Sequence, residues 1–165
     1  MARAAIALGG NVGDVAATFE RAISELCRDA PARLLARSAN FSTPPWGVEA
    51  QPPFLNACIL VETRTPPREL LARMHGVERA HGRDRSRETR WGPRALDLDL
   101  LTYDDLEIVA PDLTLPHPRL TERGFVLAPL AEIAPEMIVR GRAVADHLAR
   151  VPLTGIKRLG SPNPP

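Results

Sequence analysis

The spacing of apolar residues predicts an order of strands and helices along the chain. Arg3 to Leu8 is a short apolar run that ends in a Gly-Gly-Asn turn, which is typical of a strand. Asp14 is placed to cap a helix over residues 15–28, whose apolar side chains recur at helical spacing. The other predicted elements are strands over 33–42, 54–63, 95–103 and 106–109, an extended stretch over 113–118, a helix that begins at Pro66-Pro67 and runs to about Arg79, a helix over 121–130 capped by Thr121, and a last helix over 144–150.

This order predicts the fold class. The succession β-α-β-β-α-β, followed by extra C-terminal helices, matches the ferredoxin-like plan of the α+β class, with a mainly antiparallel sheet and helices on one side. A chain of 165 residues suits one core, so we expect a single domain over residues 1–160 and a frayed tail over 161–165. Because one fold hosts many functions, the function has to be argued from particular residues.

Composition excludes several classes of protein. Hydrophobic residues are 44% and charged residues 25%, which argues against a disordered or fibrous chain. Lys and Arg number 21 against 20 acids, so nothing suggests a basic surface for nucleic acid or membrane. No apolar run approaches the ~20 residues of a membrane span. Cys27 and Cys58 lack metal or redox spacing. These features predict a cytoplasmic protein without nucleic-acid or membrane partners.

Arginine dominates the basic residues and narrows the chemistry further. Lys157 is the only lysine in the sequence, and it stands near the C-terminus. A Walker A loop, a protein-kinase lysine and a Schiff base each need a lysine in another context. The sequence also lacks the G-x-S-x-G, H-E-x-x-H and G-x-G-x-x-G motifs. Several large enzyme classes are therefore excluded.

Two aspartates in the predicted strand over 95–103 are the sharpest chemical signal. Asp97 and Asp99 lie two residues apart, so they share one face of the strand, opposite Leu96, Leu98 and Leu100. Aspartate is disfavoured in strands, and two neighbouring anions repel each other. A divalent cation between them removes that cost, and Mg²⁺ is commonly held by two carboxylates together with substrate phosphates. The alternative is that both simply face solvent.

An arginine-rich loop precedes this strand. Its basic residues are Arg83, Arg85, Arg87, Arg90 and Arg94. The planar guanidinium group matches phosphate oxygens, so the loop and a bound cation could act on one polyphosphate. The alternative is an exposed loop whose arginines balance Asp84 and Glu88. The Gly92-Pro93 step favours the first interpretation, because it fixes the backbone that presents Arg94.

The segment Trp91-Gly92-Pro93-Arg94-Ala95-Leu96-Asp97-Leu98-Asp99-Leu100 resembles the signature of the 6-hydroxymethyl-7,8-dihydropterin pyrophosphokinases. Further matching blocks, in the same order, are residues 8–11, 42–45, 54–57, 115–118, 123–125 and 129–135, and the pair Glu78 and Arg83. The resemblance covers nearly the whole chain. It implies an ATP-dependent diphosphokinase of folate biosynthesis, which transfers the pyrophosphoryl group of ATP to the 6-hydroxymethyl oxygen of the pterin and gives AMP and the pterin diphosphate.

The resemblance also implies how the pterin is held. Asn56 corresponds to the family's residue for hydrogen bonds to the pterin edge, and backbone groups of Thr43 and Trp46 complete that edge. Phe54 and Phe125 correspond to the two rings that enclose the bicycle, although many relatives have Tyr in place of Phe54. Without the resemblance, core packing would be the better interpretation of either phenylalanine.

On the nucleotide side, the resemblance implies that Asp97 and Asp99 hold two Mg²⁺ ions that bridge the triphosphate. The expected catalytic residues are Arg83, Arg94, Asp97 and Asp99, and the expected ATP contacts are His75, Glu78, Arg85, Trp91, Arg94, His117 and Arg123. The loop over 82–92 is expected to close over ATP and exclude water. We expect the protein to be a monomer whose only partners are its substrates.

Some positions depart from the family pattern. Pro118 stands where the family often has Tyr, and His75 where a residue like Gln is common. His81 and His147 have no special context, and we expect them at the surface. Two alternatives stay open. One is a Mg²⁺-dependent phosphohydrolase that uses Asp97 and Asp99 with a metal-bound water, and the other is a ferredoxin-like nucleic-acid or interaction module without catalysis.

Overall fold

The computed structural model describes residues 1–45, 50–84, 86 and 92–160. Its elements are β1 (Ala2–Gly10), α1 (Val15–Asp29), β2 (Ala32–Arg37), β3 (Phe41–Thr43), β4 (Phe54–Thr63), α2 (Pro67–Ala80), β5 (Asp97–Tyr103), β6 (Ile108–Val109), β7 (Thr114–Leu115), a 3₁₀ turn (Leu120–Glu122), α3 (Gly124–Ile133), β8 (Ile138–Val139), β9 (Arg142–Ala143), α4 (Val144–Leu148) and β10 (Lys157–Arg158). The predicted β-α-β-β-α-β order is confirmed.

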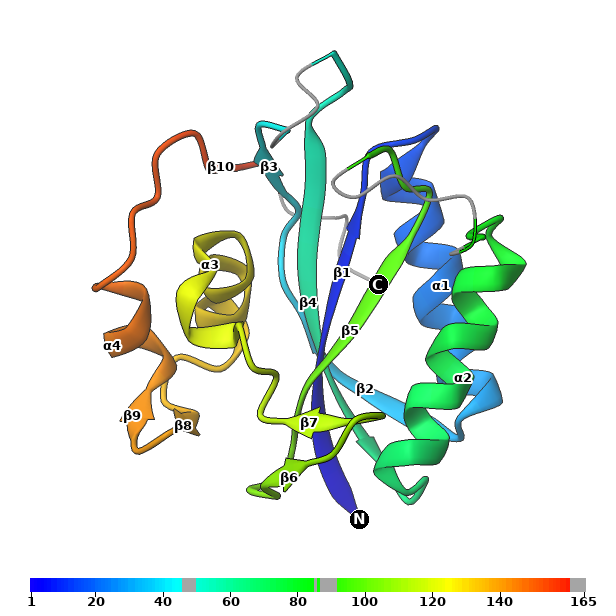
Figure 1. Ribbon diagram of the computed structural model, residues 1–165, viewed down its shortest axis with the longest axis vertical. Helices are drawn as coiled ribbons and strands as arrows, with labels where there is room; N and C mark the ends of the chain where they lie inside the picture. Colours follow the sequence, from blue (N-terminus) through cyan, green and yellow to red (C-terminus); the bar gives the residue numbers. More distant parts are fainter. Residues whose placement is uncertain (46–49, 85, 87–91, 161–165) are drawn as a thin grey trace.

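One antiparallel sheet forms the centre of the molecule (Figure 1). Its strands run in the order β10-β3-β4-β1-β5. Strand β2 pairs with β4 on the same side as β3, farther along β4. Every strand pair in it is antiparallel, as the ferredoxin-like prediction requires. The register sets Gly9 opposite Asp97 and Ala7 opposite Asp99, so the two aspartates stand beside the small residues that end β1.

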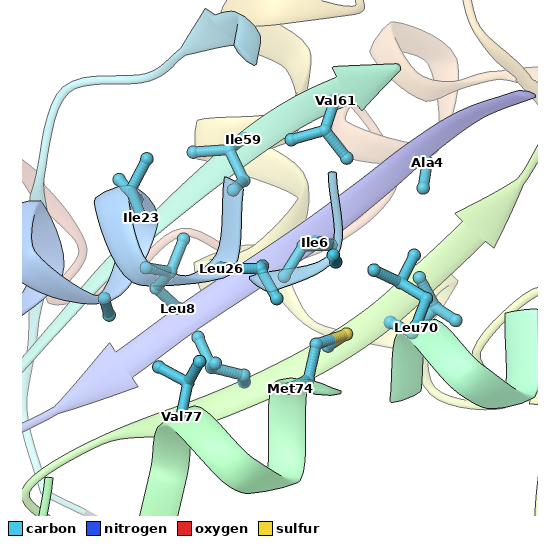
Figure 2. Packing of buried hydrophobic residues seen from close by; sticks show 14 of the residues in the cluster. Ala4, Ile6, Leu8, Ile23, Leu26, Ile59, Val61, Leu70, Met74 and Val77 are labelled. Carbon is cyan, nitrogen blue, oxygen red and sulfur yellow. The ribbon is translucent and has the colours of Figure 1, made fainter. Parts of the chain in front are cut away.

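Two apolar layers cover the two faces of this sheet. Helices α1 and α2 cover one face, where Figure 2 shows side chains from both helices directed at the strands of the sheet. The buried residues that meet there include Ala4, Ile6, Leu8, Ile23, Leu26, Ile59, Val61, Leu70, Met74 and Val77. On the other face α3 and α4 pack against Ala5, Ala7, Cys58 and Leu101. The predicted helices on one side, with extra C-terminal helices, are therefore confirmed.

The predicted strand over 33–42 is wrong in one respect, because it is interrupted between β2 and β3. The Ser38 backbone N–H donates to the Cys58 carbonyl over 2.9 Å, and the Ser38 hydroxyl accepts from the Cys58 N–H over 2.9 Å. That hydroxyl also donates to the Ala39 carbonyl over 2.8 Å. A side-chain oxygen thus takes the place of a backbone carbonyl in the ladder, and the regular strand pairing stops there.

The helix termini include one success and one error. Asp14 caps α1 as predicted, because its carboxylate accepts from the Ala17 N–H over 3.1 Å. Thr121 does not cap a helix. It lies within the 3₁₀ turn, and α3 begins after the extended residue Arg123. The hydrogen bond from the Glu122 N–H to the Arg119 carbonyl closes the tighter turn first.

The C-terminal quarter holds elements that apolar spacing did not predict. The strands β8, β9 and β10 are two residues each, too short for a periodic pattern. His147 is buried, with its Nε2 atom 2.7 Å from the Val139 carbonyl oxygen, so its predicted surface position is wrong. In the part of the chain that the structure describes, no helix is long and apolar enough to cross a membrane.

Candidate functional site

Asp97 and Asp99 lie on the sheet face opposite α1 and α2, at the edge of a cavity of about 450 Å³. Their side chains are 27% and 32% exposed, whereas Leu98 and Leu100 between and beyond them are buried in the core. The predicted alternation is therefore confirmed. The carboxylates face a partly enclosed cavity rather than open solvent, which argues against the solvent-facing alternative.

This cavity brings together every described residue predicted to hold the pterin, and with them several of the predicted catalytic, metal-binding and ATP-binding residues. They are Thr43, Phe54, Asn56, Arg94, Asp97, Asp99, Arg123 and Phe125. They come from β3, β4, β5, the segment before β5 and the start of α3, so only the fold makes them neighbours. Trp46, Arg85 and Trp91, which the sequence also singled out, lie outside the residues that the structure describes.

A polar edge and an aromatic pair line the same cavity. The buried Asn56 donates from Nδ2 to the Thr43 hydroxyl over 3.0 Å, and this bond fixes the orientation of the amide. Phe54 and Phe125 are half-buried and border the cavity, so each keeps ring surface for a ligand. The Arg123 guanidinium carbon lies 5.6 Å from the centre of the Phe125 ring, within range of a cation–π contact.

Asp97 belongs to a buried ionic network. The Arg83 guanidinium donates to Asp97 over 2.5 Å and also donates to Glu78, and its side chain is only 6% exposed. Glu78 in turn accepts from the Leu98 backbone N–H over 3.0 Å. The side chain of Glu78 is 2% exposed, so its described contacts hold Arg83 and β5 in place. Its predicted contact with ATP stays a prediction.

Asp99 has a different environment. Burial, followed by the negative charge of Asp97, raises the pKa of Asp99 to about 7. The His117 Nε2 atom and an Arg123 nitrogen each lie 3.9 Å from its carboxylate oxygens. Burial and the charge of Arg123 lower the pKa of His117 to about 4, so this imidazole is neutral at pH 7. An additional cation beside Asp99 would relieve its unfavourable charge.

The donor set fits a hard divalent cation. Two carboxylates on one strand face supply oxygen ligands, which Mg²⁺ prefers, and it commonly completes its shell with water and substrate phosphates. Among the residues that the structure covers, no group of three or more His, Cys, Asp or Glu side chains could hold a metal by itself. Asp97 and Asp99 therefore suit a cation that arrives with a phosphorylated substrate.

A second cavity of about 320 Å³ adjoins the first. Asp99 lines both, and the smaller cavity also includes His75, His117 and Pro118. Its remaining walls come from α2, β5 and the chain from the end of β6 into β7. The apolar residues are Leu71, Leu98, Leu100, Ala110, Pro111 and Leu113, and the polar ones are Asp112 and Thr114. His75 and His117, which the sequence predicted as ATP contacts, thus line the same cavity. Asp99 lies where this smaller cavity meets the larger one.

Asn11, for which the sequence predicted no role, connects the loops around the site. Asn11 is buried, and its Nδ2 atom donates to the Gln51 side chain over 2.9 Å and to the Pro52 carbonyl over 3.0 Å. Its Oδ1 atom accepts from the Arg94 N–H over 2.9 Å, and its own N–H donates to the Arg94 carbonyl over 2.9 Å. Its place in the Leu8–Asn11 block was the signal that could have found it.

Comparisons with known proteins show which family the chain resembles. The model of the family described as 7,8-dihydro-6-hydroxymethylpterin-pyrophosphokinase (HPPK) matches residues 5–135. A 2-amino-4-hydroxy-6-hydroxymethyldihydropteridine pyrophosphokinase of Methylorubrum extorquens is 43% identical over 96% of this chain and 99% of its own length. The enzyme of that name from Bacillus subtilis is 42% identical over 80% of this chain and 78% of its own.

Solved structures support the fold. A Plasmodium falciparum HPPK-DHPS variant, crystallised with pterin and p-hydroxybenzoate, has a TM-score of 0.74 at 13% identity, over 95% of this chain and 46% of that chain. This chain thus spans less than half the length of that protein, and at this identity the likeness concerns the fold alone. The family match and the close relatives go further: the chain belongs to the 7,8-dihydro-6-hydroxymethylpterin-pyrophosphokinase family.

Proposed function

We propose that the two adjoining cavities hold the two substrates of one reaction, the pterin in the larger and the nucleoside of ATP in the smaller. Family membership makes the chain an ATP-using pyrophosphokinase of folate biosynthesis. The pyrophosphoryl group of ATP passes to the 6-hydroxymethyl oxygen of 6-hydroxymethyl-7,8-dihydropterin, and AMP leaves. The observation that supports the assignment of cavities is that Asp99 lines both of them, with Asp97 two residues away on the same face.

The larger cavity suits a flat, hydrogen-bonding bicycle. Phe54 and Phe125 offer ring surface, and aromatic pairs of this kind favour stacked or edge-to-face contacts. Asn56 and Thr43 present amide and hydroxyl groups whose mutual hydrogen bond sets their direction in advance. A site built to pair with the polar edge of a ring discriminates strongly against ligands that lack that edge, because buried polar groups would be left unpaired.

The smaller cavity suits the nucleoside part of ATP. Leu71 and Leu100 supply apolar walls for the base, and the neutral His117 can exchange a hydrogen bond with ribose or phosphate. The triphosphate would extend toward Asp99, where Arg123 and Arg94 line the junction from the side of the larger cavity. Because Pro118 has no aromatic ring, the base would rely on aliphatic contacts at that position.

Asp97 and Asp99 would hold two Mg²⁺ ions, which would supply positive charge to neutralise the charge that develops on the phosphate oxygens. Arg83 and Arg94 supply fixed positive charge beside Asp97, at 2.5 Å and 3.8 Å from its oxygens. Phosphoryl transfer of this kind depends on positioning and charge neutralisation and needs no covalent help from the protein. The pterin oxygen forms the new bond to phosphorus, and the bond between that phosphorus and the AMP oxygen breaks.

Product analysis tests the reaction directly. The purified protein is incubated with ATP, Mg²⁺ and 6-hydroxymethyl-7,8-dihydropterin, and the products are separated by chromatography. We expect AMP and the pterin diphosphate in equal amounts, formed only when both substrates are present. ADP, free phosphate or turnover without pterin would instead support the phosphohydrolase, and a lack of any turnover would favour the interaction module.

The subunit composition and the compartment are part of the proposal. We expect a monomer, with its two small molecules as substrates, in the cytoplasm where ATP is available. Light scattering during gel filtration, with and without both substrates, should give the mass of a single chain.

A further inference from the structure

The C-terminal segment over residues 151–158, here called the strap, passes along one side of the larger cavity. It follows α4 and runs beside α3 to β10, which joins the sheet next to β3 (Figure 1). Pro152, Thr154 and Ile156 of the strap line the cavity together with the predicted pterin residues. The strap lies beyond residues 5–135, so the family model does not extend to this wall.

Specific contacts hold the strap in place. Lys157 pairs with Ser42 and Arg158 with Phe41 in the sheet register, next to Thr43 on the same strand. The Arg158 guanidinium also donates twice to the Glu132 carboxylate of α3, over 2.8 and 3.1 Å. The strap is thereby attached both to the strand that carries the polar edge and to the helix that begins beside Phe125.

The turn within the strap brings Ile156 against the start of α3. The Ile156 N–H donates to the Leu153 carbonyl over 3.0 Å, and Gly155 inside this turn has φ +79°, which favours glycine. A Cβ atom on Gly124 would lie 2.9 Å from the Pro152 carbonyl oxygen and 3.0 Å from Ile156 Cδ1. Only a residue without a side chain therefore leaves room for the strap next to Phe125.

The opposite side of the turn meets the strand of the polar edge. A Cβ atom on Gly155 would lie 3.0 Å from Cγ of Pro44, the residue after Thr43. The strap thus fits between the start of α3 and the end of β3, and these two elements carry the aromatic and the polar sides of the cavity. Ile156 is half-buried and apolar, so a ring that fills the cavity would remove more of its surface from water.

We propose that Ile156 is a pterin-positioning residue, and that the docked strap forms the wall that keeps the bicycle between Phe125 and the polar edge. This inference rests on the proposed function, because it places the pterin in the larger cavity. It adds a specificity-determining wall from a segment outside the family match. In the described structure no strap residue lines the smaller cavity, so the strap acts on one substrate only.

The test compares Ile156→Ala with wild type by fluorescence titration with 6-hydroxymethylpterin and by steady-state kinetics. We expect the pterin Kd and KM to rise about 3- to 10-fold, because part of one apolar wall is lost. The KM for ATP and kcat should stay within about twofold. Ile156→Val, which keeps a branched side chain, should restore most of the affinity. Leu159→Ala, an exposed position that does not line the cavity, is the matched control.

Gly155→Ala provides a second variant, since the new methyl group would press on Pro44 and displace the strap. It should raise the pterin KM in the same direction, with thermal unfolding measured on each variant to show that the fold is kept. The strap proposal is refuted if neither variant changes the pterin Kd while wild type binds pterin normally, or if the KM for ATP rises as much as that for pterin. A wild-type protein that neither binds pterin nor forms AMP would refute the proposed function itself, and the strap proposal with it.

Discussion

The two faces of the central sheet use the same strands for different purposes. On the α1–α2 side, β5 contributes Leu98 and Leu100 to the apolar core, at the point where the smaller cavity borders it. On the other side the same strand presents Asp97 and Asp99 to a cavity that α3 and α4 leave open. Because side chains alternate between the two faces of a strand, neighbouring residues of β5 serve packing on one face and chemistry on the other.

The two faces should affect the free energy of unfolding differently. Buried residues that face α1 and α2 and do not line the smaller cavity stabilise the fold through burial, so changes there should lower the free energy of unfolding and leave the kinetic constants of the folded fraction unaltered. Residues that face the cavity bring charges close together, which costs stability unless a ligand arrives. Changes on that side should reduce activity far more than stability.

The largest effect is expected at Asp99, one of the two carboxylates proposed to hold Mg²⁺. Asp99→Asn removes the charge that faces both cavities, and we expect kcat to fall by about 10³-fold or more, because transition-state charge loses its counterion. Circular dichroism should show an unchanged fold. Asp105→Asn, at an exposed acidic position of the turn after β5, is the matched control and should retain full activity. An Asp99→Asn enzyme within tenfold of wild type would contradict the two-metal assignment.

On the opposite face, Met74→Ala should do the reverse. Met74 is fully buried between α2 and the sheet (Figure 2), and truncation of such a side chain costs about 2–5 kcal/mol of unfolding free energy. Urea denaturation measures that loss, while kcat and both KM values of the folded protein should stay near wild type. Arg73→Ala, next to it on the exposed side of α2, should change stability by less than about 0.5 kcal/mol. A drop in kcat at unchanged stability would show that the two faces are not separate.

Asn11 directly follows β1 and contacts two loops. It tests whether a residue that positions loops also affects activity more than stability. Asn11→Asp keeps an acceptor for the Arg94 N–H but removes the two donor bonds to Gln51 and Pro52. Asn11→Ala removes all of these side-chain bonds. We expect kcat to fall by about 10-fold or more in Asn11→Ala, since small misplacements of phosphate-binding groups are costly. The pterin KM should rise in both variants. Equal kcat values for the two variants would show that the bond to Arg94 plays no part in catalysis.

The sequence predicted regular elements well where one physical rule decided them. Strand β4 begins and ends at the predicted residues, because a long apolar run is bounded by prolines and a polar turn. The helix cap at Asp14 and the shared face of Asp97 and Asp99 follow from local geometry alone. The break at Ser38 could not be predicted, because it depends on a hydroxyl that meets a strand twenty residues away.

Parts of the site depend on tertiary contacts that no local pattern reveals. Glu78 reads as a residue on an amphipathic helix, yet in the fold it is buried and binds Arg83 and the backbone of β5. The strap was missed for a similar reason, since Ile156 becomes part of the cavity only after β10 joins the sheet. The family resemblance supplied Glu78 as an expected ATP contact but not its buried contacts, and it did not extend to the strap.

The smallest effect concerns the charge of Asp99 in the protein without metal. Its pKa is raised from an ordinary carboxyl value to about 7, so the folded state binds this proton more tightly than the unfolded state does. Its contribution to stability is therefore present at low pH and is lost as the pH rises toward 7. Asp99→Asn lacks that loss. We expect the Tm of the variant to exceed that of wild type by a few degrees at pH 7.5 and by less at pH 5.

His117, whose lowered pKa has the opposite effect, is present in both proteins, so it largely cancels in the difference. Thermal unfolding in EDTA measures this, and Mg²⁺ with ATP should narrow the gap at pH 7.5, because bound cations stabilise only the ionised carboxylate. A gap that does not depend on pH would mean that the cavity face carries no stored charge repulsion, and the contrast between the two faces would then rest on packing alone.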